Sequence, residues 1–448
     1  MTDSITASLI SARGIDLNQL EQVRTNVQAW QTDHGTQVRF VESRQLPMVD
    51  VVLRFNAGTS LDAEHSGLAA LTLYMLDEGT EQRDANAFAE QIEQLGAVTD
   101  AQIRLEHASL SLRSLSSAAV LEPAMALFTE MVARPGFGAP QLAKVKQQLL
   151  AFQASRLQSR AHRARAEAFA QLYAGHPYGT PMGGNAAGIE AISREDLQAF
   201  HRRAYTANNL QVSIVGDLSR ADAEALVEAL AQALPQGWAA AELAPAPLNS
   251  PATVHTDADG ASNTLLLAVP MSGQPLHADF PALMLAVDAL GAGFDSRLMH
   301  ELRQRRGLTY DIRSRVSPLK AGGVLSIDWD CAAQYTKATQ TLVAQMLEAL
   351  VEQGPSEAEL ALARQQRSGQ LVRAVATNQE LVELLSITCQ QGLPPEHLIN
   401  YQTQLSAVTV QSARAALQQQ LDLTRKVAVS IGTRAPQASL PELPINEQ

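Results

Sequence analysis

The sequence predicts an α+β protein of two similar domains, each with a mainly antiparallel sheet that is covered on one face by helices. Three observations lead to this prediction. A chain of 448 residues is too long for one ordinary hydrophobic core. An alanine- and proline-rich run, WAAAELAPAPLNSPAT, divides the chain into nearly equal halves and favours an extended linker. Each half also places strands before long helices, an order typical of layered α+β domains. We therefore expect an N-terminal domain at 1–237, a linker at 238–253 and a C-terminal domain at 254–448.

The first half opens with a half-buried strand near residues 49–56, because apolar Val49, Val51 and Leu53 alternate with polar residues such as Asp50 and Arg54. Periodicity predicts the elements that follow: helices at 66–77 and 84–95, an alternating strand around 108–112, and helical stretches around 117–133 and 140–173.

The second half repeats this order. An apolar strand, NTLLLAV, is expected at 263–269. The same criteria predict the later elements: helices at 279–290 and 296–306, an alternating strand around 325–329, and helices at 335–353 and 356–377.

The two halves also end alike. The segment 191–217 aligns with 407–433 at a constant offset and without a gap. The shared unit is a helix opened by Ser193 or Thr409, then a short apolar strand and a glycine turn. This internal similarity supports two related domains.

Composition excludes several classes of protein. A hydrophobic content of 46% with 18% charged residues is typical of a globular chain. The net charge of −12 gives no sign of the basic face that nucleic-acid binding requires. The most apolar segment, near 280–290, is interrupted by Asp288 and is too short to span a membrane. Cys331 and Cys389 make neither a disulfide framework nor a cysteine-based zinc site, and the sequence leaves open whether they pair.

The segment FNAGTSLDAEHSGLAALTLYMLDEGT at 55–80 resembles the zinc-motif region of the insulinase-like metallopeptidases, the family of pitrilysin and the mitochondrial processing peptidase. The family pattern runs roughly A-G-S, an acidic loop, G-L-A-H-x-x-E-H-M-L and G-T. The chain keeps the following residues of this pattern: Ala57, Gly58, Gly67, Leu68, Ala69, Met75, Leu76, Gly79 and Thr80. The resemblance covers essentially the whole chain in element order. It implies that the two domains form half of a clam-shell chamber.

The zinc motif itself is missing. In the family, two histidines one helical turn apart hold zinc, and the glutamate between them activates the bound water. The matching positions here hold Ala70, Leu73 and Tyr74. A methyl group cannot ligate, Leu cannot take a proton, and a phenol with a pKa of about 10 is a poor ligand at neutral pH.

No other residues replace these ligands. The family's remaining ligand is a glutamate on a later helix, expected near 145–155, but no Asp or Glu occurs between Glu130 and Glu167. Ten histidines are scattered along the chain, none spaced for one helix face or paired with a cysteine at ligand spacing, at positions 34, 65, 107, 162, 176, 201, 255, 277, 300 and 397. We therefore expect no metal or cofactor in this chain.

The segment LGAGFDSRLMHELRQRRGLTYDI at 290–312 resembles another part of the family, in which an Arg precedes a Tyr by seven residues. Arg303 and Tyr310 match that spacing. The resemblance implies that Tyr310 donates a hydrogen bond to the tetrahedral oxyanion and that Arg303 orients the Tyr and the substrate carbonyl, at a zinc site in another domain or subunit. One such donor contributes ~3 kcal/mol in a dry site. Arg305 and Arg306 are expected to face solvent, and the loop His176-Pro177-Tyr178-Gly179 to be structural.

The resemblance implies a non-catalytic subunit of a heterodimeric zinc metallopeptidase that cleaves short or unfolded peptides. A homologous partner would carry H-x-x-E-H and zinc, while this chain would supply Arg303 and Tyr310, and it could also form a homodimer when alone. The alternative is a structural or peptide-binding subunit with no role in hydrolysis. Bacterial relatives of this kind are often periplasmic. The first residues, MTDSITASLI, lack signal-peptide features, so we expect either a cytoplasmic chain or one whose leader has been removed.

Overall fold

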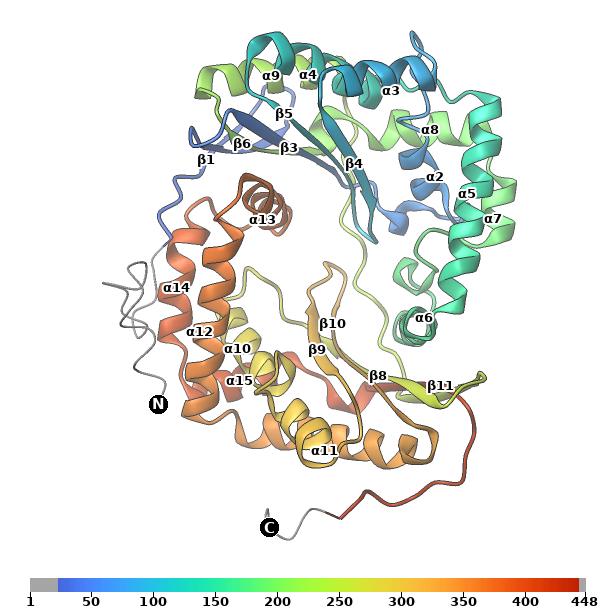
Figure 1. The fold of residues 1–448 in the computed structure, drawn as a ribbon, viewed down its shortest axis with the longest axis vertical. Coiled ribbons are helices and arrows are strands. Elements are labelled where there is room, and N and C mark those ends of the chain that lie inside the picture. The colour runs from blue at the N-terminus through green and yellow to red at the C-terminus, as the bar shows by residue number, and fades with distance from the viewer. Residues whose placement is uncertain (1–22, 443–448) are drawn as a thin grey trace.

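The computed structural model describes residues 23–442, which form two β-sheets that face each other across the molecule, with helices around them (Figure 1). The prediction of an α+β fold with two mainly antiparallel sheets is confirmed. None of the described helices is long and apolar enough to cross a lipid bilayer.

The first sheet has the strand order β1-β2-β6-β3-β5-β4, and only the β2–β6 pair is parallel. Its strands are β1 (Gln28–Gln31), β2 (Gln37–Glu42), β3 (Met48–Phe55), β4 (Val98–Ile103), β5 (Ala108–Leu115) and β6 (Leu210–Gly216). Strand β3 was predicted to be half-buried, but every residue after Met48 is buried. Asp50 is buried because it pairs with Arg113 at 2.7 Å.

The second sheet has the order β7-β11-β8-β10-β9, with one parallel pair, β7–β11. Its strands are β7 (Ala252–Asp257), β8 (Ser262–Met271), β9 (Ile312–Ser317), β10 (Gly323–Ala332) and β11 (Val427–Gly432). Apart from β1, each strand of the first sheet has an equivalent in the second: β2 with β7, β6 with β11, β3 with β8, β5 with β10, and β4 with β9.

The repeated unit at the end of each half is confirmed. Helix α8 (Arg194–Ala204) and helix α15 (Val410–Gln420) begin with capping boxes at Ser193 and Thr409, whose side chains accept hydrogen bonds from the third residue of the helix. One 3-10 turn follows each helix, η4 (Ala207–Asn209) or η7 (Leu423–Arg425), and then β6 or β11. The local sequence therefore encodes this unit twice.

Helices cover the outer face of each sheet. Over the first sheet lie α2 (Leu68–Tyr74), α3 (Ala85–Gln94), α4 (Ala118–Ala133), α5 (Ala139–Gln158), α8 and α9 (Arg220–Ala233), while α7 (Ala186–Ala191) lies beside α5. Over the second lie α10 (Phe280–Gly291), α11 (Thr336–Gln353) and α15, while α12 (Glu357–Ala374) and α14 (His397–Ala407) pack beside α10. The helical stretch expected at 140–173 is broken at Ser159, whose hydroxyl accepts a hydrogen bond from the His162 N–H and so opens a new helix, α6 (Arg160–Leu172).

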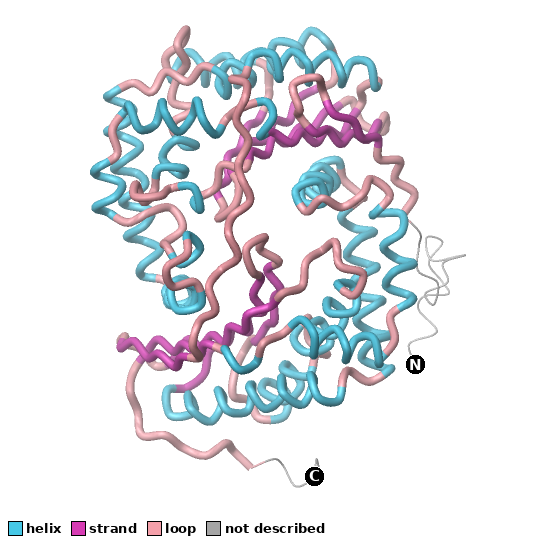
Figure 2. The backbone as a smooth tube through the Cα atoms, turned by 180° about the vertical axis from the view of Figure 1, so that it is seen from behind, coloured by secondary structure: helices cyan, strands magenta, loops and turns pink. Residues whose placement is uncertain are grey.

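The inner faces are not bare: besides the face that its own helices cover, each sheet contacts a helix from the other half. Helix α13 (Asn378–Gln390) of the second half packs on β3 and β6 of the first sheet. Helix α6 of the first half packs on β8 and β11 of the second sheet. Both helices lie between the two sheets (Figures 1 and 2). The halves thus exchange one helix each.

Polar contacts add to this exchange. Tyr178, in the loop expected to be structural, donates its hydroxyl proton to Glu106 of the β4–β5 turn and accepts a hydrogen bond from the Ala321 N–H at 3.3 Å. Tyr173 donates to the Gly322 carbonyl at 2.8 Å. The loop of the first half is therefore bound to the β9–β10 turn of the second.

The chain between α9 and β7 contains no helix or strand, and β7 begins at Ala252, inside the range expected for the linker. Hydrogen bonds hold this segment against both halves of the protein. The carbonyl of Ala244 lies 3.1 Å from His176 Nε2, and the Ala246 N–H donates to Ala321 at 2.7 Å. The domain boundaries themselves stay a prediction. Cys331 and Cys389 are both buried free thiols.

Replacing a buried side chain of α13 tests the exchange of helices. Leu385 is 1% exposed and packs with Val52 and Val215 of the first sheet. Leu385→Ala is expected to lower the free energy of unfolding by about 2–4 kcal/mol, because it leaves a cavity in this contact. Urea denaturation measures the change. Ile387→Ala, on the same helix but 41% exposed, is the control and should change stability by less than about 0.5 kcal/mol.

Candidate functional site

Helix α2 lies where the resemblance places the zinc motif, and its start is built by a buried carboxylate. Asp62 is 4% exposed and accepts hydrogen bonds from the backbone N–H groups of Gly67 and Ala69, at 2.8 Å each. Gly67 has φ of 102°, a left-handed conformation that glycine adopts without strain. The acidic loop therefore caps the helix, since a carboxylate at a helix N-terminus satisfies free N–H groups.

The three motif positions on α2 serve packing. Ala70 and Leu73 are buried in the core of the first half, and Tyr74 packs partly buried against it. Burial raises the pKa of the Tyr74 phenol, while the charges of Arg104 and Arg156 oppose that rise. Helix α5, the later helix expected to carry the glutamate ligand, thus presents an arginine toward Tyr74. Within residues 23–442, no three His, Cys, Asp or Glu side chains converge to hold a metal ion.

Arg303 and Tyr310 lie side by side. The guanidinium carbon of Arg303 is 4.4 Å from the centre of the Tyr310 ring and 5.3 Å from that of Phe294. Arg303 is therefore stacked between two aromatic rings, a contact that favours the cation. Tyr310 is 81% exposed and Phe294 is 56% exposed, so this group lies open on the surface.

The segment that carries Arg303 is wound as a π-helix, η5 (Met299–Arg305), a form that is rare and often found at functional sites. The side chain of Glu301 pairs with Arg305 at 2.6 Å and with Arg306 at 2.7 Å. Burial favours the neutral acid, but the hydrogen bonds from Arg306 and Arg305 hold the pKa of Glu301 below its usual value. The prediction that Arg305 and Arg306 face solvent is wrong, because this carboxylate draws both inward.

Local contacts define the two ends of this segment. The Ser296 hydroxyl donates to the Gly293 carbonyl at 2.8 Å. Strand β9 begins at Ile312. Leu308–Asp311 is a connection, and Tyr310 points outward from it.

A cavity of about 1150 Å³ lies between the two halves. Its walls come from the β4–β5 turn, α5, α6, the linker, the β9–β10 hairpin and α13. Their basic side chains are Arg104, Arg156, Arg165 and Lys320. Sequence reasoning missed these residues, because they come from distant segments and share no local motif.

The Arg303–Tyr310 pair does not line this cavity. Val316 and Ser317, at the far end of β9, do line it. Six residues of extended chain separate Tyr310 from Val316, which corresponds to roughly 20 Å. The pair is therefore not part of the wall of this cavity.

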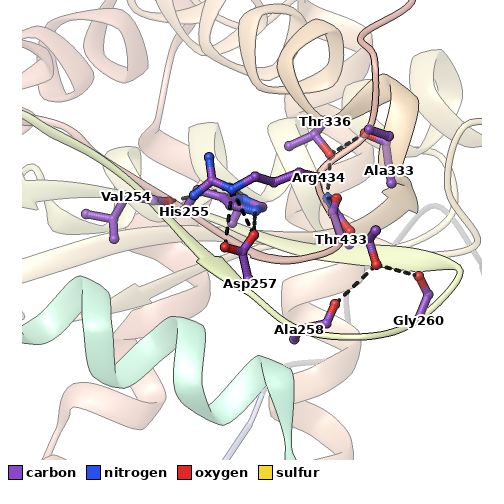
Figure 3. Close-up of polar contacts among 12 residues, drawn as sticks. Val254, His255, Asp257, Ala258, Gly260, Ala333, Thr336, Thr433 and Arg434 are labelled. Carbon is purple, nitrogen blue, oxygen red and sulfur yellow. Dashed lines mark hydrogen bonds and ion pairs between the residues drawn. The ribbon is translucent and has the colours of Figure 1, made fainter.

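A Ser–His–Asp group is present in the second sheet, and Figure 3 shows its His255 and Asp257 together with Arg434. His255 Nδ1 lies 2.9 Å from Ser430 Oγ, and its Nε2 lies 3.2 Å from Asp257 Oδ1. Ser430 is only 3% exposed, so a substrate cannot reach its hydroxyl, and Asp257 also pairs with Arg434 at 2.9 Å. The group joins β7 to β11 and the chain that follows, and it is not a nucleophilic site.

Comparison with protein families agrees with the fold. The model of the insulinase family (peptidase family M16) matches residues 38–183, and that of the peptidase M16 inactive domain matches residues 191–367. The chain belongs to peptidase family M16. Its assignment rests on both halves, and the inactive-domain model spans the end of the first half and more than half of the second.

Some similar proteins are named as zinc proteases and others as non-peptidase homologues. The non-peptidase homolog YmxG of Helicobacter pylori is 28% identical over 334 residues, covering 72% of this chain and 74% of that protein. An uncharacterized zinc protease of Mycobacterium leprae is 26% identical over 384 residues, covering 84% of each. The crystal structure of a peptidase M16 inactive domain from Pseudomonas fluorescens is 36% identical, with a TM-score of 0.89, covering 93% of this chain and all of that one.

Metal analysis tests the altered helix directly. The purified chain is expected to contain far less than one zinc per molecule, because Ala70, Leu73 and Tyr74 offer no ligand at neutral pH. The protein is incubated with zinc and then dialysed against zinc-free buffer. Inductively coupled plasma mass spectrometry measures the zinc that stays bound. One tightly bound zinc per chain would show that a site exists elsewhere.

Removing the Asp62 carboxylate tests its role as a cap. Asp62→Ala is expected to lower the free energy of unfolding by about 1–3 kcal/mol, because two buried N–H groups lose their acceptor. Urea denaturation measures the loss. The matched control is Asp84→Ala at the exposed N-cap of α3, where water replaces the lost acceptor and the effect should be smaller.

Proposed function

We propose that this M16 chain is the non-catalytic subunit of a two-chain zinc metallopeptidase. A homologous partner with H-x-x-E-H holds the zinc and its water, and this chain contributes Tyr310 and Arg303 to the partner's site. The observation that carries the proposal is the stacked, exposed Arg303–Tyr310 pair in a chain whose motif helix has no zinc ligands.

The exposure of the pair supports a role between chains. A phenol that stabilises an oxyanion must reach the reacting carbonyl and must be shielded from water when it acts. With 81% of Tyr310 exposed, the shielding has to come from another molecule. Stacking on Phe294 and Tyr310 holds the Arg303 guanidinium in place, so it remains close to the phenol.

The substrate class proposed is a short or unfolded peptide. Strands β4 and β9 are the last strands of their sheets on one side, so each presents an edge in the described structure. An extended peptide pairs with such an edge through main-chain hydrogen bonds, which depend little on sequence. A folded protein offers no free strand for this pairing.

A second function is favoured by a specific observation. The pair lies outside the chain's own cavity, so peptide binding in that cavity needs neither residue. A subunit that binds peptides or serves assembly would use the cavity without hydrolysis. Arg303 and Tyr310 would then have no catalytic role. Tyr310 and Arg303 variants distinguish the two functions.

The test mixes this chain with a homologous chain that carries H-x-x-E-H and measures zinc-dependent cleavage of a quenched fluorescent peptide. Tyr310→Phe is expected to lower kcat of the mixture by roughly ten- to a thousand-fold, because one oxyanion donor is lost. Tyr335→Phe removes the same hydroxyl from a partly buried tyrosine outside the site and is the matched control.

Size-exclusion chromatography of each mixture checks that the two chains still associate. An unchanged rate for an associated Tyr310→Phe mixture would reject hydrolysis by this pair and leave the binding function. A rate that falls equally for Tyr335→Phe would show a general structural effect and would also count against the assigned role.

A further inference from the structure

We infer that the cavity between the two halves is a binding site for acidic peptide segments, with basic side chains and exposed apolar side chains as its two recognition elements. This goes beyond the proposed function, because it concerns binding by this chain alone and does not depend on hydrolysis.

Unpaired positive charge lines the cavity. Arg104, Arg156, Arg165 and Lys320 come from four different segments. In the part of the chain that the structure describes, none of them lies within 4.0 Å of a carboxylate oxygen. About half of the arginines elsewhere in residues 23–442 have such a partner. Within the same range, the side chains of Arg104, Arg156 and Lys320 make hydrogen bonds to neutral groups only. A group of cations without carboxylate partners favours an anionic ligand.

The acids of the lining, Glu106 and Glu242, are fewer than its four arginine and lysine side chains. Glu106 accepts hydrogen bonds from the Tyr178 hydroxyl and from the backbone N–H of Lys320, the latter at 2.7 Å. Glu242, the other acid in the lining, is exposed. Burial raises the pKa of Asp328, and the charges of Arg315 and Arg165 oppose this rise. One acid therefore stands beside two cations there.

The ionisable groups of the cavity wall affect one another's pKa values. Burial lowers the pKa of the His107 imidazole to about 3, and the charges of Arg54, Arg104 and Lys320 add to this effect. Burial also lowers the pKa of Arg156, with a further contribution from Arg104. His107 is therefore neutral at pH 7, and the positive charge belongs to the arginines and Lys320. A carboxylate placed among them would relieve their mutual repulsion.

The apolar part of the lining favours a peptide over a small anion. Leu276 is 61% exposed and Ile387 is 41% exposed, and both line the cavity. At about 1150 Å³ the cavity exceeds the usual range of small-molecule pockets, about 300–1,000 Å³. An extended segment that carries both carboxylates and apolar side chains satisfies both parts of the wall.

A nucleic acid fits less well. Single-stranded nucleic acids bind to grooves in which aromatic rings stack on successive bases. Among the Phe, Tyr and Trp residues of 23–442, only Phe169 lines this cavity. The wall offers charge without a stacking surface.

The test uses the full chain without a partner. A short peptide containing several Glu and Leu residues, labelled with an uncharged fluorophore, is titrated with protein and followed by fluorescence anisotropy. The comparison peptide has Gln in place of each Glu. The acidic peptide is expected to bind at least tenfold more tightly, a difference that corresponds to about 1.4 kcal/mol.

Variants locate the site. The double variant Arg156→Gln with Arg165→Gln is expected to weaken binding of the acidic peptide about tenfold and to leave the Gln peptide unchanged. Arg163→Gln is the matched control, because Arg163 lies on the same helix as Arg165, is similarly exposed and does not line the cavity. Circular dichroism confirms that each variant is folded.

Three outcomes would overturn the inference. The first is equal affinity for the Glu and Gln peptides. The second is unchanged binding by the folded double variant. The third is displacement of the peptide by an oligonucleotide of equal charge, or by inorganic phosphate at constant ionic strength, which would show a general anion site. Because no partner is present, a failed Tyr310→Phe test in the two-chain mixture leaves these results unaffected.

Discussion

The exchange of α6 and α13 is the contact on which the shape of the molecule depends. The inner faces of both sheets are apolar, with Val52 and Val215 in the first and Leu266 and Val429 in the second. Each is covered by a helix from the opposite half. Full burial of one Val or Leu side chain contributes about 1.5–3 kcal/mol, so moving the halves apart would expose several such side chains at once. The cavity between them is therefore a fixed feature with walls from both halves.

Local patterns in the sequence were sufficient to predict the repeated parts of this fold. Ser193 and Thr409 were expected to open equivalent helices, and both are capping residues in the structure. The exchange could not be predicted in this way. Nothing in the alternation of β3 indicates that the side of the strand carrying Val52 is covered by a helix more than 300 residues later, because that contact is tertiary. The same cover buries Arg54, which donates to Gln390 at 3.0 Å and was expected to lie on the exposed side.

The candidate site also has parts that local sequence predicts and parts that depend on tertiary contacts. The loss of zinc ligands could be predicted from the sequence because the motif occupies one helix, and a change at Ala70, Leu73 or Tyr74 is visible there. The seven-residue spacing of Arg303 and Tyr310 indicated a pair, and the structure places them in contact. Their exposure depends on where η5 lies in the fold, which spacing does not reveal. The cavity wall has no sequence signature at all, because its basic residues come from separate elements.

Charge is distributed unevenly in this chain, and the distribution has a consequence for recognition. The net charge of −12 repels an acidic peptide at a distance, yet the Debye length is about 8 Å at physiological ionic strength, so most surface carboxylates act over a short range only. Partly buried cations such as Arg156 and Arg165 are screened much less. Attraction thus begins once a segment has entered the cavity. An acidic segment would then be selected by its slow dissociation, since long-range steering does not raise its association rate.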